Sequence, residues 1–178
     1  MRTWPSEELI RWASRLPDDC SVLEIGCGNG CNLQALPGFA VGLDLAVRAL
    51  RLDRTSGTRL VVGTALLLPF LSQSLQAVAD VLCTQHLNWL DHYRVYQEVL
   101  RVLRPGGRFF SLHWSADNDL ETLEAIFPNL GTYSMADVDE LEAGLSHLGF
   151  DCTTELVTKT YKHRTVSVQY LVLDALKR

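Results

Sequence analysis

The stretch Val22–Gly30 constrains the fold more than any other part of the chain. The apolar segment Ser21–Ile25 has the β-branched character of a buried parallel strand, and it runs directly into glycines at alternate positions, Gly26, Gly28 and Gly30. Gly26 permits a sharp turn because no Cβ obstructs it. Gly28 and Gly30 let a ligand lie on the main chain, where the free N–H groups of a following helix start point at it. The stretch predicts a Rossmann-like nucleotide site.

The spacing of these glycines narrows the kind of ligand. A dinucleotide fingerprint would place its third glycine where this chain has Cys31. The observed pattern is E-x-G-x-G-x-G, and the acidic Glu24 would repel a pyrophosphate but not a ligand that carries an ammonium group. S-adenosylmethionine carries an ammonium and a sulfonium and no phosphate, and the stretch resembles motif I of the class I S-adenosylmethionine-dependent methyltransferases. From this motif alone, a strand and glycine turn without a ligand is the alternative.

Charge and cysteine content exclude several other classes of function. The net charge of −5 and the lack of a long basic run argue against attraction to nucleic acid or to an anionic membrane. The five cysteines are odd in number and form no C-x-x-C pair, so we expect neither a disulfide framework nor a metal site. The charged N-terminal stretch and a longest apolar run of only Ala65–Leu71 argue against a signal peptide or a membrane span. We therefore expect a cytoplasmic protein.

Two further stretches extend the resemblance. Asp44 follows Gly26 by 18 residues, near the spacing at which a carboxylate accepts hydrogen bonds from a ribose. Asp44 also suits the N-cap of a helix over 46–54, and both roles are compatible. Gly63-Thr64-Ala65 stands where the family commonly has Gly-Asp-Ala, so Thr64 takes the place of a carboxylate that binds the adenine amino group, or serves only as a loop residue.

A third stretch and the chain's ending complete the resemblance. Residues 98–107, ending Arg104-Pro105-Gly106-Gly107, closely resemble the family's helix and tight turn before strand five. The segment 84–89, the expected helix from Asp119 and the segment 172–177 also resemble the malonyl-carrier-protein O-methyltransferases, which suggests a carboxylate or hydroxyl acceptor.

Periodicity and breaker residues predict an alternation of strands and helices along the whole chain. Strands are expected over 21–25, 39–43, 59–62, 75–84, 108–114, 151–160 and 165–173, and helices over 5–16, 31–36, 46–54, 91–103, 119–127 and 134–148, the last capped by Ser134. The resemblance implies an α/β Rossmann-like seven-stranded sheet in the order 3-2-1-4-5-7-6, with strand 7 antiparallel and helices on both faces. It implies one domain over 1–178, made of a cover helix (1–20), a cofactor-binding half (21–115) and C-terminal helices with a hairpin (116–178).

The resemblance also implies a cofactor, S-adenosyl-L-methionine, and the residues that hold it. These are Glu24, Gly26, Cys27, Gly28, Gly30, Asp44, Leu45, Gly63, Thr64, Ala65, Thr84 and Gln85. The family transfers a methyl group by an SN2-type displacement in which positioning dominates. A general base is needed only if the acceptor must lose a proton, and His86 and His113, at the ends of strands four and five, are the candidates. For each, the alternative is a histidine that lines the pocket without titrating.

The acceptor itself is the least constrained part of the prediction. An Asn/Asp-Pro-Pro-Tyr motif, which several nucleic-acid and protein methyltransferases use, is absent from the sequence. We expect a small-molecule substrate, no nucleic acid and no membrane, and the sequence leaves the oligomeric state open. Two alternative hypotheses remain. One is a non-catalytic S-adenosylmethionine-binding module or partner subunit. The other is a nucleotide-binding oxidoreductase, and Glu24 and Cys31 argue against it.

Overall fold

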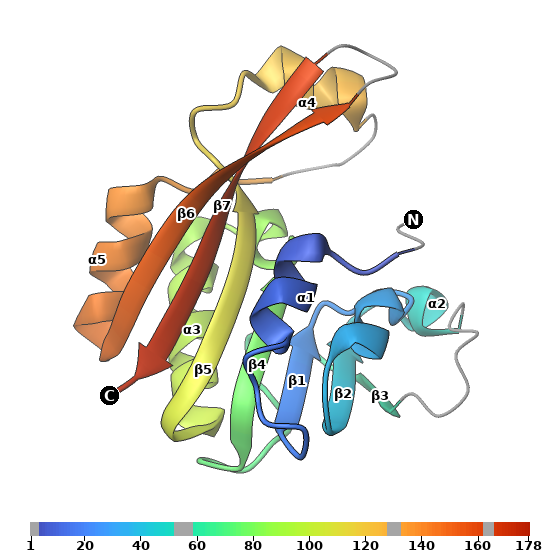
Figure 1. Ribbon diagram of the computed structural model, residues 1–178, viewed down its shortest axis with the longest axis vertical. Helices are drawn as coiled ribbons and strands as arrows, with labels where there is room; N and C mark the ends of the chain where they lie inside the picture. Colours follow the sequence, from blue (N-terminus) through green and yellow to red (C-terminus); the bar gives the residue numbers. More distant parts are fainter. Residues whose placement is uncertain (1–3, 52–58, 128–132, 162–165) are drawn as a thin grey trace.

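A seven-stranded sheet forms the central layer of the computed structural model, which describes residues 4–51, 59–127, 133–161 and 166–178 (Figure 1). Its strand order is β3-β2-β1-β4-β5-β7-β6, and β7 runs antiparallel to both β5 and β6, as predicted. The strands are β1 (Ser21–Ile25), β2 (Phe39–Asp44), β3 (Arg59–Val62), β4 (Leu75–Val81), β5 (Leu103–Trp114), β6 (Phe150–Tyr161) and β7 (Val166–Lys177). The apolar runs that predicted β1 and β4 are buried, as the inner strands of a parallel sheet require.

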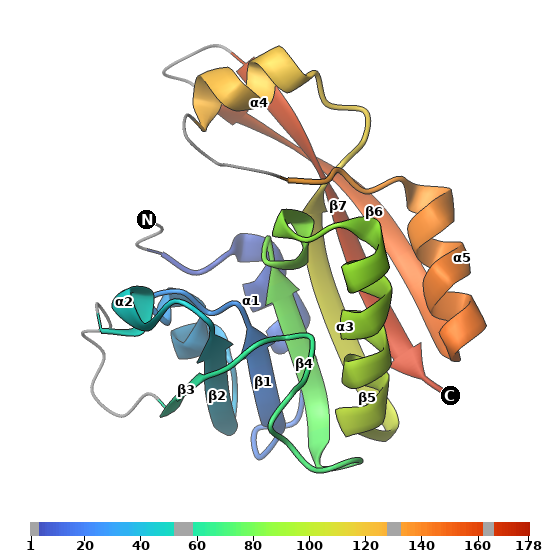
Figure 2. The same ribbon diagram turned by 180° about the vertical axis from the view of Figure 1, so that it is seen from behind.

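Helices cover both faces of this sheet. α3 (Trp89–Val102) and α5 (Val138–Leu148) lie on one face, and α1 (Glu7–Ala13) lies on the other (Figures 1 and 2). α3 buries Val95, Tyr96 and Val99, whereas α1 buries Leu9 and Trp12 against a separate cluster. The short elements are η1 (Cys31–Ala35), α2 (Val47–Leu50), η2 (Thr84–His86) and α4 (Leu120–Ile126). Figure 1 shows α4 beyond the end of β5, beside the outer ends of β6 and β7.

Several element boundaries differ from the predicted ones. α5 begins at Val138 with Asp137 as its N-cap, not at Ser134, and the preceding residues form a bridge between Ala136 and Ser115. Strand four ends at Val81 and is followed by η2. β5 begins early, at Leu103, because the Pro-Gly-Gly stretch loops out of the strand instead of preceding it. The predicted helix over 46–54 is described only to Leu50 and the turn residue after it, and positions 52–54 and 165 lie outside the described residues.

No described helix is long and apolar enough to cross a lipid bilayer.

Candidate functional site

A cleft lies at the carboxyl ends of β1, β2 and β4, where ligands bind in open α/β sheets. It has two adjoining compartments of about 360 Å³ and about 280 Å³, which share Gly26 and Leu82. The larger is lined by Gly26, Leu43, Asp44, Leu45, Gly63, Thr64, Ala65, Leu66, Leu82, Cys83, His86 and Leu87. The smaller is lined by Gly26, Cys27, Gly28, Asn29, Cys31, Asn32, Ala49, Val81 and Leu82. Eight of the predicted cofactor-binding residues therefore come together here: Gly26, Cys27, Gly28, Asp44, Leu45, Gly63, Thr64 and Ala65.

The glycine turn after β1 needs its glycines for different reasons. Gly26 and Gly28 both adopt positive φ, +64° and +56°, a region that side chains with a Cβ rarely enter. A Cβ on Gly26 would lie 2.2 Å from Cys83 Sγ, so this glycine allows β1 and β4 to approach each other at their ends. A Cβ on Gly28 would meet no described atom within 4 Å. The space over Gly28 is therefore open for a ligand to lie on the main chain, while Gly30 forms the N-cap of η1.

Asp44 ends β2 at the wall of the larger compartment. Its Oδ2 accepts a hydrogen bond from the Gly28 amide at 2.7 Å, and its Oδ1 accepts one from the Ala46 amide at 2.7 Å. The N-cap of α2 is Ala46 and not Asp44, so the predicted capping role is wrong. Each carboxylate oxygen has a second acceptor site, which leaves Asp44 able to bind ligand hydroxyls as well.

The loop after β3 forms the opposite wall. The Gly63 amide donates to the carbonyl of Asp44 at 3.1 Å, which joins the two walls directly. Thr64 Oγ1 accepts from the Leu66 amide at 3.2 Å, so its hydroxyl stabilises the loop while it faces the compartment. The hydroxyl keeps its own proton to donate, in contrast to the aspartate that the family commonly has here.

Glu24 lies behind the smaller compartment with only 1% of its surface exposed. Its Oε1 accepts from Asn32 Nδ2 at 2.6 Å, and Asn32 Oδ1 accepts from the Ser6 amide at 3.0 Å. Asn32 was not among the predicted site residues. A signal for it exists, because a carboxylate inside a buried strand needs a nearby donor, and Asn32 is a polar residue in the short η1 that follows.

The turn after β4 differs from the prediction for two residues. Thr84 and Gln85 are buried and do not line the cleft. Asp80 holds this turn, because its carboxylate accepts from the Cys83 amide at 2.9 Å, from the Thr84 amide at 3.3 Å and from Thr84 Oγ1. Leu82, Cys83 and Leu87, which were not predicted, line the cleft instead.

The two candidate bases lie in different environments. His86 is exposed and lines the larger compartment. His113 is fully buried, does not line the cleft, and has its Nε2 2.7 Å from Ser111 Oγ. Burial lowers the pKa of His113 to about 4, although the nearby Asp80 carboxylate acts to raise it. The geometry therefore supports only His86 as a group that an acceptor in the cleft reaches.

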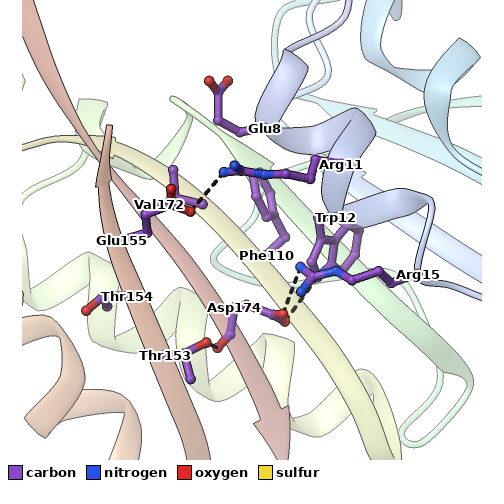
Figure 3. A pocket seen from close by; sticks show the side chains of 10 residues that line it. All are labelled: Glu8, Arg11, Trp12, Arg15, Phe110, Thr153, Thr154, Glu155, Val172 and Asp174. Atoms are coloured by element: carbon purple, nitrogen blue, oxygen red, sulfur yellow. Dashed lines mark hydrogen bonds and ion pairs between the residues drawn. The ribbon is translucent and has the colours of Figure 1, made fainter. Parts of the chain in front are cut away.

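A second cavity, of about 490 Å³, lies between α1 and the strands β5, β6 and β7 (Figure 3). Arg11, on α1, pairs across it with Glu155 at 2.9 Å, and Arg15, just after α1, pairs with Asp174 at 3.0 Å. Trp12 Nε1 also donates to Asp174 Oδ1 at 3.1 Å. These contacts hold α1 against the outer strands β6 and β7. We therefore interpret the residues that line this cavity as structural.

In the described part of the chain, no group of three or more His, Cys, Asp or Glu side chains is placed to hold a metal ion.

Comparison with known proteins identifies the family. Residues 23–111 match the model of a methyltransferase domain. A tRNA (carboxymethyluridine(34)-5-O)-methyltransferase of Arabidopsis thaliana is 26% identical over 118 residues, which cover 65% of this chain and 29% of that protein. A phthiotriol/phenolphthiotriol dimycocerosates methyltransferase of Mycobacterium tuberculosis is 34% identical over 114 residues, which cover 58% of this chain and 41% of that protein. The chain thus spans less than half the length of either relative.

Solved structures confirm the fold. A possible histamine N-methyltransferase of Thermotoga maritima, described as S-adenosylmethionine-dependent, superposes with a TM-score of 0.75 at 20% identity, covering 96% of this chain and 88% of that chain. The family match includes the glycine turn, Asp44 and the strands β1 to β4 that form the cleft. The chain belongs to the class I S-adenosylmethionine-dependent methyltransferase family, whose cofactor is S-adenosyl-L-methionine.

Proposed function

We propose that this protein transfers a methyl group from S-adenosylmethionine to a small-molecule acceptor that binds in the larger compartment beside His86. The observation that carries the proposal is the convergence of the Gly28 turn, the Asp44 carboxylate and the Gly63–Ala65 loop on one cleft. The open space over Gly28 fits a ligand held by the main chain. The lining is mostly apolar apart from Asp44, Thr64 and His86, which suits an adenosine and a small organic acceptor.

Each wall of the cleft has a separate part in holding the cofactor. Asp44 accepts hydrogen bonds from the ribose hydroxyls, and Thr64 accepts one from the adenine amino group. Glu24 is buried behind the glycine turn and lines neither compartment, so we infer that its charge attracts the ammonium of the methionine half from behind this turn. Loss of the family's usual aspartate at position 64 makes adenine binding weaker than ribose binding, because a hydroxyl acceptor lacks the charge of a carboxylate.

The cofactor supplies a methyl group on a positively charged sulfur, which leaves as a neutral thioether. The protein's contribution is to hold the acceptor in line and to exclude water, since such a displacement needs little acid catalysis. The apolar Leu66 and Leu87 form part of the surface against which an acceptor packs. His86 takes a proton when the acceptor is a neutral hydroxyl or amine, and it only binds the acceptor when the acceptor is already an anion.

A second candidate acceptor is a carboxyl group on a modified uridine of tRNA. The observation that favours it is the match to the plant protein, whose name specifies carboxymethyluridine in tRNA. A carboxylate acceptor is an anion at neutral pH, so this reaction requires no base. The net charge of −5 disfavours it, because tRNA binding depends on neutralising phosphates with basic side chains.

The test is transfer of a labelled methyl group from S-adenosylmethionine into a fresh cell extract. The extract is then separated into small molecules, RNA and protein. Label in the small-molecule fraction supports the leading proposal, and label that ribonuclease releases from the RNA fraction supports the second. Tight binding of the cofactor without label in any fraction would instead identify a non-catalytic cofactor-binding module. Calorimetry with S-adenosylhomocysteine and with NAD is the companion measurement, and preferential binding of NAD contradicts both candidates.

A further inference from the structure

A line of buried polar contacts connects the cofactor cleft to the outer strand β6 through helix α1. Lys159 on β6 donates to Glu8 Oε2 at 2.8 Å, and Ser6 Oγ donates to the same oxygen at 2.6 Å. The Ser6 amide donates to Asn32 Oδ1, and Asn32 Nδ2 donates to Glu24 Oε1. Ser6, Glu8, Asn32 and Glu24 are each no more than 5% exposed. These contacts span 151 residues of sequence between Glu8 and Lys159.

The orientation of the Asn32 amide is fixed by its two neighbours. The Ser6 N–H is a donor and requires the Asn32 oxygen, so the Asn32 NH₂ group must face the Glu24 carboxylate. Rotating the amide by half a turn would place a donor against a donor at Ser6 and an acceptor against an acceptor at Glu24. The start of α1 and the Glu24 carboxylate therefore favour the same orientation of the Asn32 amide.

The other end of this line fixes the start of α1. Burial alone would raise the pKa of Glu8, but hydrogen bonds from Lys159 and Ser6 outweigh burial and lower it. Glu8 is therefore a carboxylate that binds both the N-cap residue of its own helix and a cation on β6. Figure 3 shows Glu8 on the same side of α1 as Arg11, which reaches toward β6.

We propose that Asn32 is a positioning residue that couples the docking of α1 to the orientation of Glu24, so that cofactor binding and α1 docking strengthen each other. The inference rests on the proposed function, because it takes Glu24 as the group whose charge attracts the cofactor's ammonium. Coupling of this kind is reciprocal. If docking of α1 raises the affinity for the cofactor by some factor, the bound cofactor raises the equilibrium constant for α1 docking by the same factor. The N-terminal helix is then a cover that tightens over the sheet when the cleft is filled.

The experiment combines a double-mutant cycle with hydrogen exchange, and its probe is S-adenosylhomocysteine, which keeps the ammonium group. The variants are Asn32→Leu, Glu24→Gln and the double variant, with Gln34→Ala as the matched control on the exposed side of η1. We expect Asn32→Leu to weaken binding about tenfold in the parent background and less than twofold in the Glu24→Gln background, because Asn32 acts through Glu24. Gln34→Ala should leave the affinity unchanged.

Hydrogen exchange measures the other direction of the coupling. S-adenosylhomocysteine should slow exchange of the α1 amides in the parent and in Gln34→Ala but not in Asn32→Leu. If Asn32→Leu does not fold, Lys159→Met tests the far end of the line, and it should speed α1 exchange and weaken binding about two- to fivefold. Additive effects in the cycle, or α1 exchange that the ligand does not change in the parent, overturn the coupling while leaving the proposed function intact. A parent that binds no S-adenosylhomocysteine overturns both.

Discussion

Replacement of Asp44 by Ala tests ligand binding and fold stability in one variant. On the binding side, the variant loses one or two charge-assisted hydrogen bonds to the ribose. At about 1.5–3 kcal/mol for each such bond, loss of one corresponds to roughly a 10- to 150-fold weaker affinity for S-adenosylhomocysteine. The same carboxylate also accepts hydrogen bonds from the amides of Gly28 and Ala46, so we expect the variant to lose stability as well.

The cost to stability follows from those two amides. The bond to Gly28 is partly buried and the bond to Ala46 is exposed, so water replaces the second more easily than the first. We expect the free energy of unfolding to fall by about 1–2 kcal/mol, near the lower end of the range for hydrogen bonds to charged groups.

Asp44→Asn is the matched variant, because it keeps one oxygen acceptor in place. It should bind ligand more tightly than Asp44→Ala and lose less stability. The assays are urea unfolding of the free proteins and calorimetric titration with S-adenosylhomocysteine. An affinity that is unchanged in Asp44→Ala would refute the ribose role, and an unchanged unfolding midpoint would refute the role of Asp44 in holding the glycine turn.

Three further predictions follow from the site and from α1. If the acceptor must lose a proton, His86→Gln should lower turnover by roughly 10²–10⁴-fold with little change in cofactor affinity, whereas equal turnover in His86→Gln and the parent excludes His86 as the base. Because the pKa of His113 falls from 6.5 to about 4 on folding, the unfolded chain binds more protons between these values. The unfolding free energy should therefore drop by up to about 3 kcal/mol as the pH falls from 6.5 to 4, and a His113→Gln variant that shows the same pH dependence would contradict this. Asp174→Asn should lower the unfolding free energy by about 1–2 kcal/mol, less so in high salt, because Asp174 binds Arg15, Arg108 and Trp12. The control is Asp151→Asn, which breaks an exposed pair with Arg178 and should lower the unfolding free energy by less than about 0.5 kcal/mol. Equal losses of stability in the two variants would contradict the stabilising role of Asp174.

The sheet was predictable because its strands follow local rules. The inner strands β1 and β4 are buried on both faces and read as short apolar runs, and the three alternating glycines mark where β1 ends. The order of the strands came from the family resemblance and not from these runs. Local rules failed at α5, where Ser134 and Asp137 are both good N-caps. Asp137 caps the helix, because Ser134 is engaged by the carbonyls of Gln85 and Leu87, some 47 or more residues earlier.

The parts of the site that the main chain defines were predictable. The parts that depend on the direction of a side chain were less predictable. Gly28 and Asp44 follow from motif spacing, and the structure places both in the cleft. His86 and His113 look equivalent in the sequence, since each ends a strand. Only the pairing of β5 with β4 and β7 shows that His113 faces a buried cluster with Ser111 and Asp80. Asn32 was missed although the buried Glu24 implies a nearby donor, and its second partner, Ser6, lies 26 residues earlier in the chain, where no local pattern points to it.

The contacts between α1 and the outer strands also determine when α1 can pack during synthesis. The Trp12–Asp174 hydrogen bond closes a loop of 162 residues, and the Arg11–Glu155 pair closes one of 144. Contacts so distant in sequence form late, because the intervening chain must be ordered first. A nascent chain on the ribosome therefore carries α1, with its apolar Leu9 and Trp12, without these partners until the last strand has emerged. Through that interval the apolar side chains of α1 lack these partners, and a chaperone that binds apolar surface would protect them.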